Sequence, residues 1–267
     1  MMKLTMLGTG NAVATECYNT CFVMQQNDSY LLVDGGGGNT LFKQLKEAQI
    51  DWKKINNIFV THKHVDHLFG IIWMLRLITQ SMQKDEYPGD VNLYGHAELL
   101  ETIKNLTQTL LSEKHFHFIE KRVHLIPVDD GEELEIIGCK IQFFDTNSAK
   151  VKQYGFLIHI NDNEKLICFG DERYNEKLYE YAKGCTWMMH EAFCLYSDID
   201  YYKPYRIHHS TVKDACEIAE MIGIKNLIIY HTEDDNLANR KELYSAEGKQ
   251  FFKGNLFIPD DLESFEF

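Results

Sequence analysis

The chain reads Thr61-His62-Lys63-His64-Val65-Asp66-His67 directly after an apolar run at residues 58–60. Such a density of metal-binding side chains in one short string is far above what chance would place there. At the end of an extended strand, His62 and His64 project to the same side, because side-chain direction alternates along a strand. Both imidazoles can therefore reach one ion. Asp66 and His67 follow where the chain turns into a helix, so they suit a second ion close by.

Two further metal-binding residues also stand directly after apolar runs. Asp171 follows the run at residues 166–169, and His231 follows the run at residues 227–230. Taken alone, each could equally be a turn residue. A dinuclear site needs more ligands than one string supplies, and the two oxygens of a carboxylate can each bind one cation. Together with the histidine string, these residues predict two divalent ions about 3.5–4 Å apart.

Composition narrows the class of protein. The 267 residues carry 27 basic and 40 acidic side chains, for a formal net charge of −13. This charge disfavours broad attraction to nucleic acid, which depends on Lys and Arg neutralising phosphates. A hydrophobic fraction of 45% and a mean hydropathy of −0.32 are typical of a soluble globular protein. With 4 prolines and no Ser/Gly-rich linker, one domain over residues 1–267 is predicted.

Cysteine usage and hydropathy indicate in which cellular compartment the protein is located. The 7 cysteines are odd in number and contain no CxxC pair, so disulfides are not expected to organise the fold. Gly8 and Gly10 interrupt the first apolar segment too early for a signal peptide, and no apolar stretch reaches about 18 residues. We therefore expect a cytoplasmic protein that does not associate with membranes.

Short apolar runs bounded by Gly, Asn or Asp recur along the chain and predict strands. They lie at residues 4–7, 21–24, 30–33, 58–60, 91–94, 123–128, 134–144, 154–160, 166–169, 186–189 and 227–230. Apolar residues three and four apart predict helices at residues 40–48, 67–81, 97–111, 175–182, 212–222 and 237–247. The predicted order is strands first and then strands mixed with helices, and this order occurs twice along the chain. It indicates two sheets packed face to face with helices outside.

Two local signals refine this prediction. Thr211, followed three residues later by Asp214, is typical of a helix N-terminus. The four glycines at residues 35–38 lack the Lys-Ser/Thr pair of a P-loop, so they predict a tight turn from strand to helix rather than a phosphate-binding loop.

In order along the chain, these motifs resemble those of the metallo-β-lactamase fold superfamily, in particular its phosphodiesterase branch, which includes ribonuclease Z and small cyclic-phosphate phosphodiesterases. The matching elements are His62-x-His64-x-Asp66-His67, Gly170-Asp171, His190-Glu191-Ala192, His209-Ser210-Thr211 and Tyr230-His231-Thr232. The resemblance extends from Leu7 to about Thr232. It implies an α/β fold, an αββα four-layer sandwich, with two Zn²⁺ or Mn²⁺ ions at one edge of the sheets.

The resemblance also implies the ligands. It assigns His62 and His64 to the first ion, Asp66, His67 and His231 to the second, and Asp171 to both. The family has a further histidine ligand of the first ion shortly before Gly155, where this chain has Asn147. An amide oxygen is a weak ligand compared with imidazole. The first site is therefore expected either to work weakly, with Mn²⁺ favoured or Asp145 recruited, or to stay largely empty.

The same resemblance implies catalytic roles. His209 would face the scissile phosphate, where a cationic imidazole can stabilise developing charge or protonate the leaving oxygen. Glu191 would orient His209, although an ordinary surface glutamate is the alternative. Asp66 would orient the attacking water and accept its proton. The Tyr-rich segment at residues 196–206 is expected either to stack a base and grip a phosphate or to form a dimer contact.

The predicted activity is metal-dependent hydrolysis of a small or cyclic phosphodiester or nucleotide. Ribonuclease Z carries a long arm for transfer RNA between its third motif and the bridging aspartate, but Asn147 and Asp171 are only 24 positions apart. We therefore expect no stable binding of duplex nucleic acid, and a homodimer is compatible with the sequence. The alternatives are a lactone or thioester hydrolase of the same fold, a non-catalytic metal- or nucleotide-binding module, and transfer-RNA processing with a basic partner.

Overall fold

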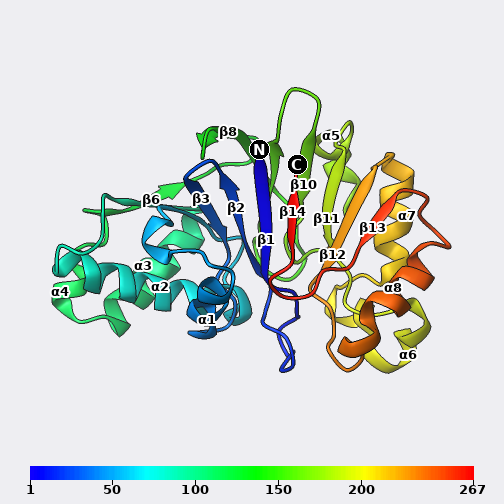
Figure 1. Ribbon diagram of the computed structural model, residues 1–267, viewed down its shortest axis with the longest axis horizontal. Helices are drawn as coiled ribbons and strands as arrows, with labels where there is room; N and C mark the ends of the chain where they lie inside the picture. Colours follow the sequence, from blue (N-terminus) through cyan, green and yellow to red (C-terminus); the bar gives the residue numbers. More distant parts are fainter.

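Two seven-stranded sheets face one another in the computed structural model, which describes residues 1–267 (Figure 1). From edge to edge, the first sheet contains β14 (Ser264–Glu266), β1 (Met2–Gly8), β2 (Cys21–Gln26), β3 (Ser29–Val33), β4 (Asn57–Phe59), β5 (Val91–Gly95) and β6 (Val123–Pro127). The second contains β13 (Asn255–Phe257), β12 (Asn226–Tyr230), β11 (Trp187–Glu191), β10 (Lys165–Cys168), β9 (Tyr154–His159), β8 (Cys139–Asp145) and β7 (Glu133–Ile136).

Helices cover the outer face of each sheet (Figure 1). The first sheet is covered by α1 (Thr40–Glu47), α2 (Val65–Gln83), α3 (Ala97–Leu110) and α4 (Glu113–Phe116). The second is covered by α5 (Tyr179–Ala182), α6 (Ile199–Tyr202), α7 (Val212–Ile222) and α8 (Arg240–Gly248). This arrangement is the predicted αββα four-layer sandwich, which is thereby confirmed.

Three apolar cores explain why the central strands are apolar on both faces. In β2, Cys21 and Val23 belong to the core beneath the first helices, whereas Phe22 and Met24 belong to the core between the sheets. A third core lies between the second sheet and its helices. Because successive side chains point to opposite faces, a strand buried on both sides reads as a continuous apolar run.

Parallel pairing places the functional residues at one edge. β3 pairs with β4 in parallel in the first sheet, and β10, β11 and β12 run parallel in the second. The carboxyl ends of such strands open toward the loops that usually carry ligand sites in α/β folds. The chain segments that follow β4, β10 and β12 carry the predicted metal ligands.

The glycine-rich segment is a strand-to-helix turn, as predicted. It joins β3 to α1, and Gly36 adopts a φ of +67°, which favours glycine. The N-terminus of α7 is also as predicted: the Thr211 and Asp214 side chains form a reciprocal capping box.

Three predictions differ from the structure. The apolar run at residues 134–144 is not one strand but two, β7 and β8, joined at Ile137 and Gly138, which both have positive φ. The helix expected at residues 175–182 is reduced to a 3₁₀ turn and the single turn α5. The sequence does not predict the short strands β13 and β14. β13 is an edge strand that pairs with β12, and β14 forms by pairing with β1, over 250 residues away.

The structure contains no disulfide bond and no candidate membrane-spanning helix. All seven cysteines are free thiols. None of the helices combines the length and the apolar character that crossing a lipid bilayer requires.

Candidate metal centre

The histidine string lies at the junction between β4 and α2. His62 is in the loop that follows β4, and His64 is the N-cap residue of α2 with extended backbone angles. Asp66 and His67 occupy the first turn of α2, where the positive end of the helix dipole favours a carboxylate. The turn from strand to helix therefore brings three imidazoles together: the ring centroid of His62 lies 4.5 Å from that of His64 and 4.2 Å from that of His67.

Two residues arrive from the opposite sheet. Asp171 follows β10 after Gly170, which has a φ of +68°, and His231 directly follows β12 with a φ of 59°. Left-handed backbone is uncommon for a histidine, and such strain gathers at functional sites. Asp171 and His231 are each at most 2% exposed, so their side chains point into the protein rather than into solvent.

Asp171 lies between two groups of imidazoles. On one side, its Oδ2 is 3.6 Å from His62 Nε2 and 4.0 Å from both His64 Nδ1 and His67 Nε2. On the other side, its Oδ1 is 3.5 Å from His231 Nδ1. His231 and His67 in turn lie 3.5 and 3.3 Å from Asp66 Oδ2 through their Nε2 atoms. The structure thus brings together all six histidine and aspartate ligands that the sequence predicts.

Several buried polar atoms in this cluster lack a hydrogen-bond partner. They are His67 Nε2, both ring nitrogens of His231 and Asp171 Oδ1. Leaving buried polar atoms unpaired is costly, and a cation within reach of these atoms would pair with them. Imidazole nitrogens with carboxylate oxygens form a donor set that suits Zn²⁺ or Mn²⁺. The group of Asp66, His67 and His231, with Asp171 beside it, therefore fits a divalent metal ion.

Asp34 supports this group and was not predicted. Its Oδ2 accepts a hydrogen bond of 2.8 Å from His67 Nδ1, and the carboxylate also accepts from the backbone and hydroxyl of Thr61. This contact orients the imidazole and leaves Nε2 free for a metal. A signal was available in the sequence, because Asp34 follows an apolar run as Asp171 does.

His209 and Glu191 form a pair next to Asp171. His209 Nδ1 lies 3.3 Å from Glu191 Oε2 and 3.2 Å from Asp171 Oδ1. Glu191 is fully buried and accepts a hydrogen bond from the Ser210 backbone, so it is not a surface residue. Burial lowers the pKa of His209, but the carboxylates of Asp171 and Glu191 more than offset this and raise it above its ordinary value. The pKa of Glu191 is lowered because contact with His209 outweighs its burial.

Asn147 is not part of the cluster. Its side chain is exposed, and its backbone and amide nitrogens bond the Asp145 carboxylate and carbonyl within their own turn. Lys150 reaches the cluster instead: its Nζ lies 3.2 Å from Asp171 Oδ2. Sequence reasoning missed this lysine, because no pattern indicates where an irregular loop will direct its side chains.

The cluster opens into a cavity of about 620 Å³. His64, Asp66, Asp171, His209 and His231 line it together with Lys63 and Lys150. Its remaining wall is formed by the small and apolar side chains of Ala12, Val65, Val151 and Ile207. A pocket of this size, with metal-binding and cationic groups on one side and apolar groups on the other, matches a small anionic molecule with an uncharged portion.

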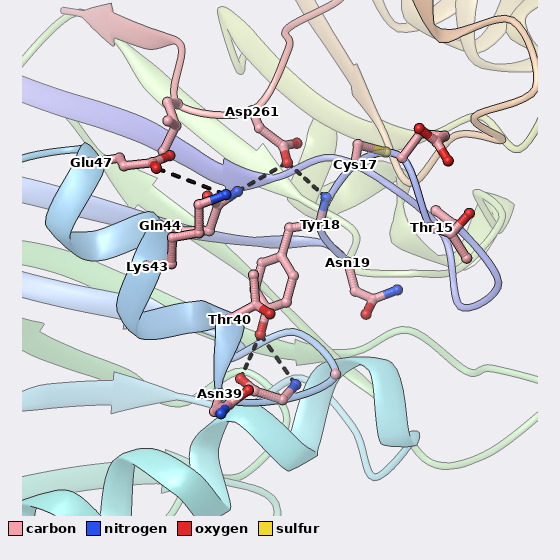
Figure 2. A pocket seen from close by; sticks show the side chains of 15 residues that line it. Thr15, Cys17, Tyr18, Asn19, Asn39, Thr40, Lys43, Gln44, Glu47 and Asp261 are labelled. Atoms are coloured by element: carbon pink, nitrogen blue, oxygen red, sulfur yellow. Dashed lines mark hydrogen bonds and ion pairs between the residues drawn. The ribbon is translucent and has the colours of Figure 1, made fainter.

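A second cavity of about 640 Å³ lies at the turn before α1 (Figure 2). Its polar groups are largely bonded to one another: Asp261 accepts from the Tyr18 backbone and Gln44, and the Tyr18 hydroxyl bonds Gly35 and Gly38. None of its lining residues belongs to a cluster that could hold a metal. These bonds secure the glycine turn that follows Asp34, so the cavity has a structural explanation.

Known proteins share this architecture. A ribonuclease Z of Archaeoglobus fulgidus is 24% identical over an alignment of 319 positions, covering 100% of this chain and 98% of that protein. The metallo-β-lactamase fold protein YhfI from Bacillus subtilis has a TM-score of 0.79 at 18% identity, with 100% and 99% of the two chains covered. A diphosphatase from the PhnP family has a TM-score of 0.74 at 19% identity, with 100% and 97% covered.

The paired sheets and the imidazole–carboxylate cluster define a hydrolase of the metallo-β-lactamase fold, with relatives of the ribonuclease Z type. Within this class, residues 2–253 match the family described as Anti-Pycsar protein Apyc1. The chain belongs to that family.

Proposed function

We propose that the protein is a metal-dependent phosphodiesterase that acts on small or cyclic phosphodiesters, cyclic nucleotides among them. The observation that carries this proposal is the position of His209. Its Nδ1 is held between Glu191 and Asp171, and its side chain lines the cavity that contains the metal-binding residues. A proton donor beside a divalent-metal centre is suited to expelling an alkoxide from phosphorus.

The names of related proteins support chemistry at phosphorus. Relatives over the whole chain are called ribonuclease Z, and a structural neighbour is called a diphosphatase. Both names denote cleavage of a bond to a phosphoryl group. Lactones and thioesters have no anionic phosphate that would require a cationic imidazole at this position.

Cavity size and charge favour a small substrate. The cavity of about 620 Å³ is in the range of small-molecule sites. β8, β9 and β10 follow one another through short connections, so no arm extends from this region to hold a large RNA. The net charge of −13 also disfavours extended contacts with duplex nucleic acid. A homodimer and a cytoplasmic location are further parts of this proposal.

The reaction needs an activated water and a protonated leaving group. A divalent ion, Zn²⁺ or Mn²⁺, bound by Asp66, His67, His231 and Asp171 would lower the pKa of water and neutralise phosphate charge. Asp66 orients the water and accepts its proton. His209 Nε2 is engaged by neither Glu191 nor Asp171 and lies 3.5 Å from Lys150 Nζ at the cavity; when the ring is protonated, this nitrogen donates the proton to the departing oxygen. Glu191 keeps the ring in that orientation.

A substrate panel with matched variants tests the proposal. Zinc- or manganese-loaded protein is assayed on bis(p-nitrophenyl) phosphate, cyclic nucleotides, a lactone and a thioester. His209→Asn should lower phosphodiester turnover at least about 100-fold, the usual contribution of a general acid. His208→Asn is the control, because His208 is exposed and asparagine tolerates its positive φ. Turnover of the lactone or thioester alone, unaffected by His209→Asn, would refute the proposal.

A further inference from the structure

The two halves of the metal centre differ in how their ligand atoms are paired. In the half formed by Asp66, His67 and His231, the ring nitrogens that face the centre lack hydrogen-bond partners. In the other half, His62 Nε2 and His64 Nδ1 lie 2.9 Å apart and bond one another. The first pattern leaves electron pairs available for a cation, whereas in the second the two nitrogens are engaged with one another, although His62, His64 and Asp171 also lie close enough together to hold an ion.

A lysine ammonium lies against Asp171, the carboxylate beside the paired imidazoles. Lys150 Nζ donates to the backbone carbonyl of Asp171 at 2.6 Å and lies 3.2 Å from Asp171 Oδ2. That oxygen is 4.0 Å from His67 Nε2 in the other half, and it lies 3.6 and 4.0 Å from His62 Nε2 and His64 Nδ1. An ion bound between these two histidines would need the same oxygen and would lie beside a fixed positive charge. The ammonium therefore competes with the ion for its ligand and also repels it.

Lys150 is built into the site rather than resting on its surface. Its side chain is only 12% exposed, and its charge is paired with the Asp171 carboxylate, as lysines with little exposure require. Its Nζ is also 3.5 Å from His209 Nε2, the nitrogen that faces the cavity. By contrast, Asn147 points its amide back to Asp145 and supplies no ligand. The loop between β8 and β9 thus offers a cation to the centre where a ligand would be expected.

We infer that Lys150 takes the place of one metal ion: the centre holds a single divalent ion at Asp66, His67, His231 and Asp171, and the Lys150 ammonium supplies the second positive charge for the phosphate of the substrate. This inference rests on the proposed function for its account of the substrate, but not for the number of ions. The site of His62, His64 and Asp171, whose carboxylate Lys150 engages, takes up metal only weakly.

Metal counting tests the inference without reference to turnover. Chelator-stripped protein is dialysed against micromolar Zn²⁺ or Mn²⁺, and bound metal per chain is measured by elemental analysis. The wild-type protein should bind one ion. Lys150→Met removes the competing charge, so a second ion should bind at least about tenfold more tightly than in the wild type. Lys150→His adds an imidazole and should bring the count to two. Lys152→Met, a change of an exposed lysine in the same loop, should leave the count at one.

Two results would overturn the inference. One is a wild-type chain that binds two ions with indistinguishable affinity; the other is a Lys150→Met variant that binds no more metal than the wild type. Anomalous density from zinc-soaked crystals gives the same answer by position. If the protein binds one ion but cleaves no phosphodiester, the proposed function fails and the inference stands. If the protein cleaves phosphodiesters with two ions bound, the inference fails and the proposed function stands.

The ammonium's role toward phosphate has its own readout. With one equivalent of Zn²⁺ bound, inorganic phosphate should bind Lys150→Met about tenfold more weakly than the wild type, because a charge-assisted hydrogen bond is lost. Lys152→Met should bind phosphate as the wild type does. Equal phosphate affinity in Lys150→Met and wild type would remove Lys150 from the substrate site.

Discussion

Asp34 Oδ2 accepts a 2.8 Å hydrogen bond from His67 Nδ1, so the end of β3 fixes the imidazole that the first turn of α2 presents to the metal centre. The bond holds the proton on Nδ1 and leaves the unpartnered Nε2 facing Asp66. Carboxylates in this relationship to a metal-binding histidine both orient the ring and raise its basicity.

Substitution of Asp34 should therefore weaken metal binding. Asparagine keeps the shape and tolerates the positive φ of this position, but only one of its two terminal atoms is an acceptor, so it cannot replace all three bonds from His67 and from the Thr61 backbone and hydroxyl. We expect Asp34→Asn to lower the affinity for Zn²⁺ roughly 10–100-fold, measured by competition with a chromophoric chelator. The control is Asp28→Asn, in the exposed turn between β2 and β3. Unchanged affinity in a folded Asp34→Asn variant would show that His67 needs no such partner.

The Glu191–His209 pair predicts a pH effect. The pKa of His209 is raised despite burial because Asp171 and Glu191 stabilise the imidazolium. If the imidazolium is the proton donor, turnover falls as the pH rises through that pKa. Glu191→Gln removes one of the two carboxylates, so the pKa of His209 falls and the alkaline limb of the profile moves to lower pH.

The measurement is kcat against pH for a saturating cyclic nucleotide, because its alkoxide leaving group needs a proton, unlike p-nitrophenolate. Glu98→Gln, which alters an exposed glutamate paired with Lys63, is the control and should leave the alkaline limb in place. An alkaline limb that stays unchanged in Glu191→Gln would assign it to a group other than His209.

How far the sequence predicts the site depends on where each residue stands relative to a strand. His231 directly follows an apolar run, and His62, His64 and Asp171 follow theirs within four residues. Strands that are buried on both faces are recognisable as such runs. Lys150 lies in the irregular loop between β8 and β9, whose path is set by hydrogen bonds such as that from Thr146 to Gln153. No periodicity records such a path, so the contact of Lys150 with Asp171 was not foreseeable.

The fold, like the site, has parts that local sequence patterns predict and parts that they do not. The central strands and long helices were predicted because their apolar patterns are local. The hairpin of β7 and β8 was read as one strand, because its turn residues Ile137 and Gly138 interrupt the apolar run only briefly. The edge strand β14 was missed, because it depends on pairing Lys3 with Glu266 across the whole chain.

Close contact between Gly35 and Gly70 predicts a steric effect. A Cβ at Gly70 would lie 1.8 Å from the Gly35 carbonyl oxygen, and the Gly70 backbone donates to the Gly36 carbonyl at 2.9 Å. Gly70→Ala must therefore separate α2 from the glycine turn, and we expect a loss of about 2 kcal/mol or more in the free energy of unfolding. Urea denaturation measures this loss. Gly38→Ala is the matched control, because a Cβ there meets nothing within 4 Å. Equal stability of the two variants would contradict the packing argument.

Arg240 joins the C-terminal segment to the metal edge. Its buried guanidinium donates to Thr232 Oγ1 at 2.7 Å, directly after His231, and to the Pro259 carbonyl at 2.8 Å. It also reaches Thr9 at the end of β1 and the Asp260 carboxylate. Replacing it with an apolar residue leaves several of these acceptors without a donor in the interior.

Arg240→Met should therefore cost about 3–5 kcal/mol in the free energy of unfolding, as for a buried charge network that loses one partner. Because Thr232 adjoins His231, the variant should also bind Zn²⁺ more weakly than the wild type when it is folded. Asp260→Asn is the comparison: the Asp260 side chain is 48% exposed, so this change should cost no more than about 1 kcal/mol. Urea unfolding measures the loss of stability in each variant, and zinc competition measures the loss of metal affinity. If Arg240→Met were no less stable than Asp260→Asn, the acceptors would have found other donors. Arg240 would then not be the residue that stabilises the metal edge by linking the C-terminal segment to Thr232, next to His231.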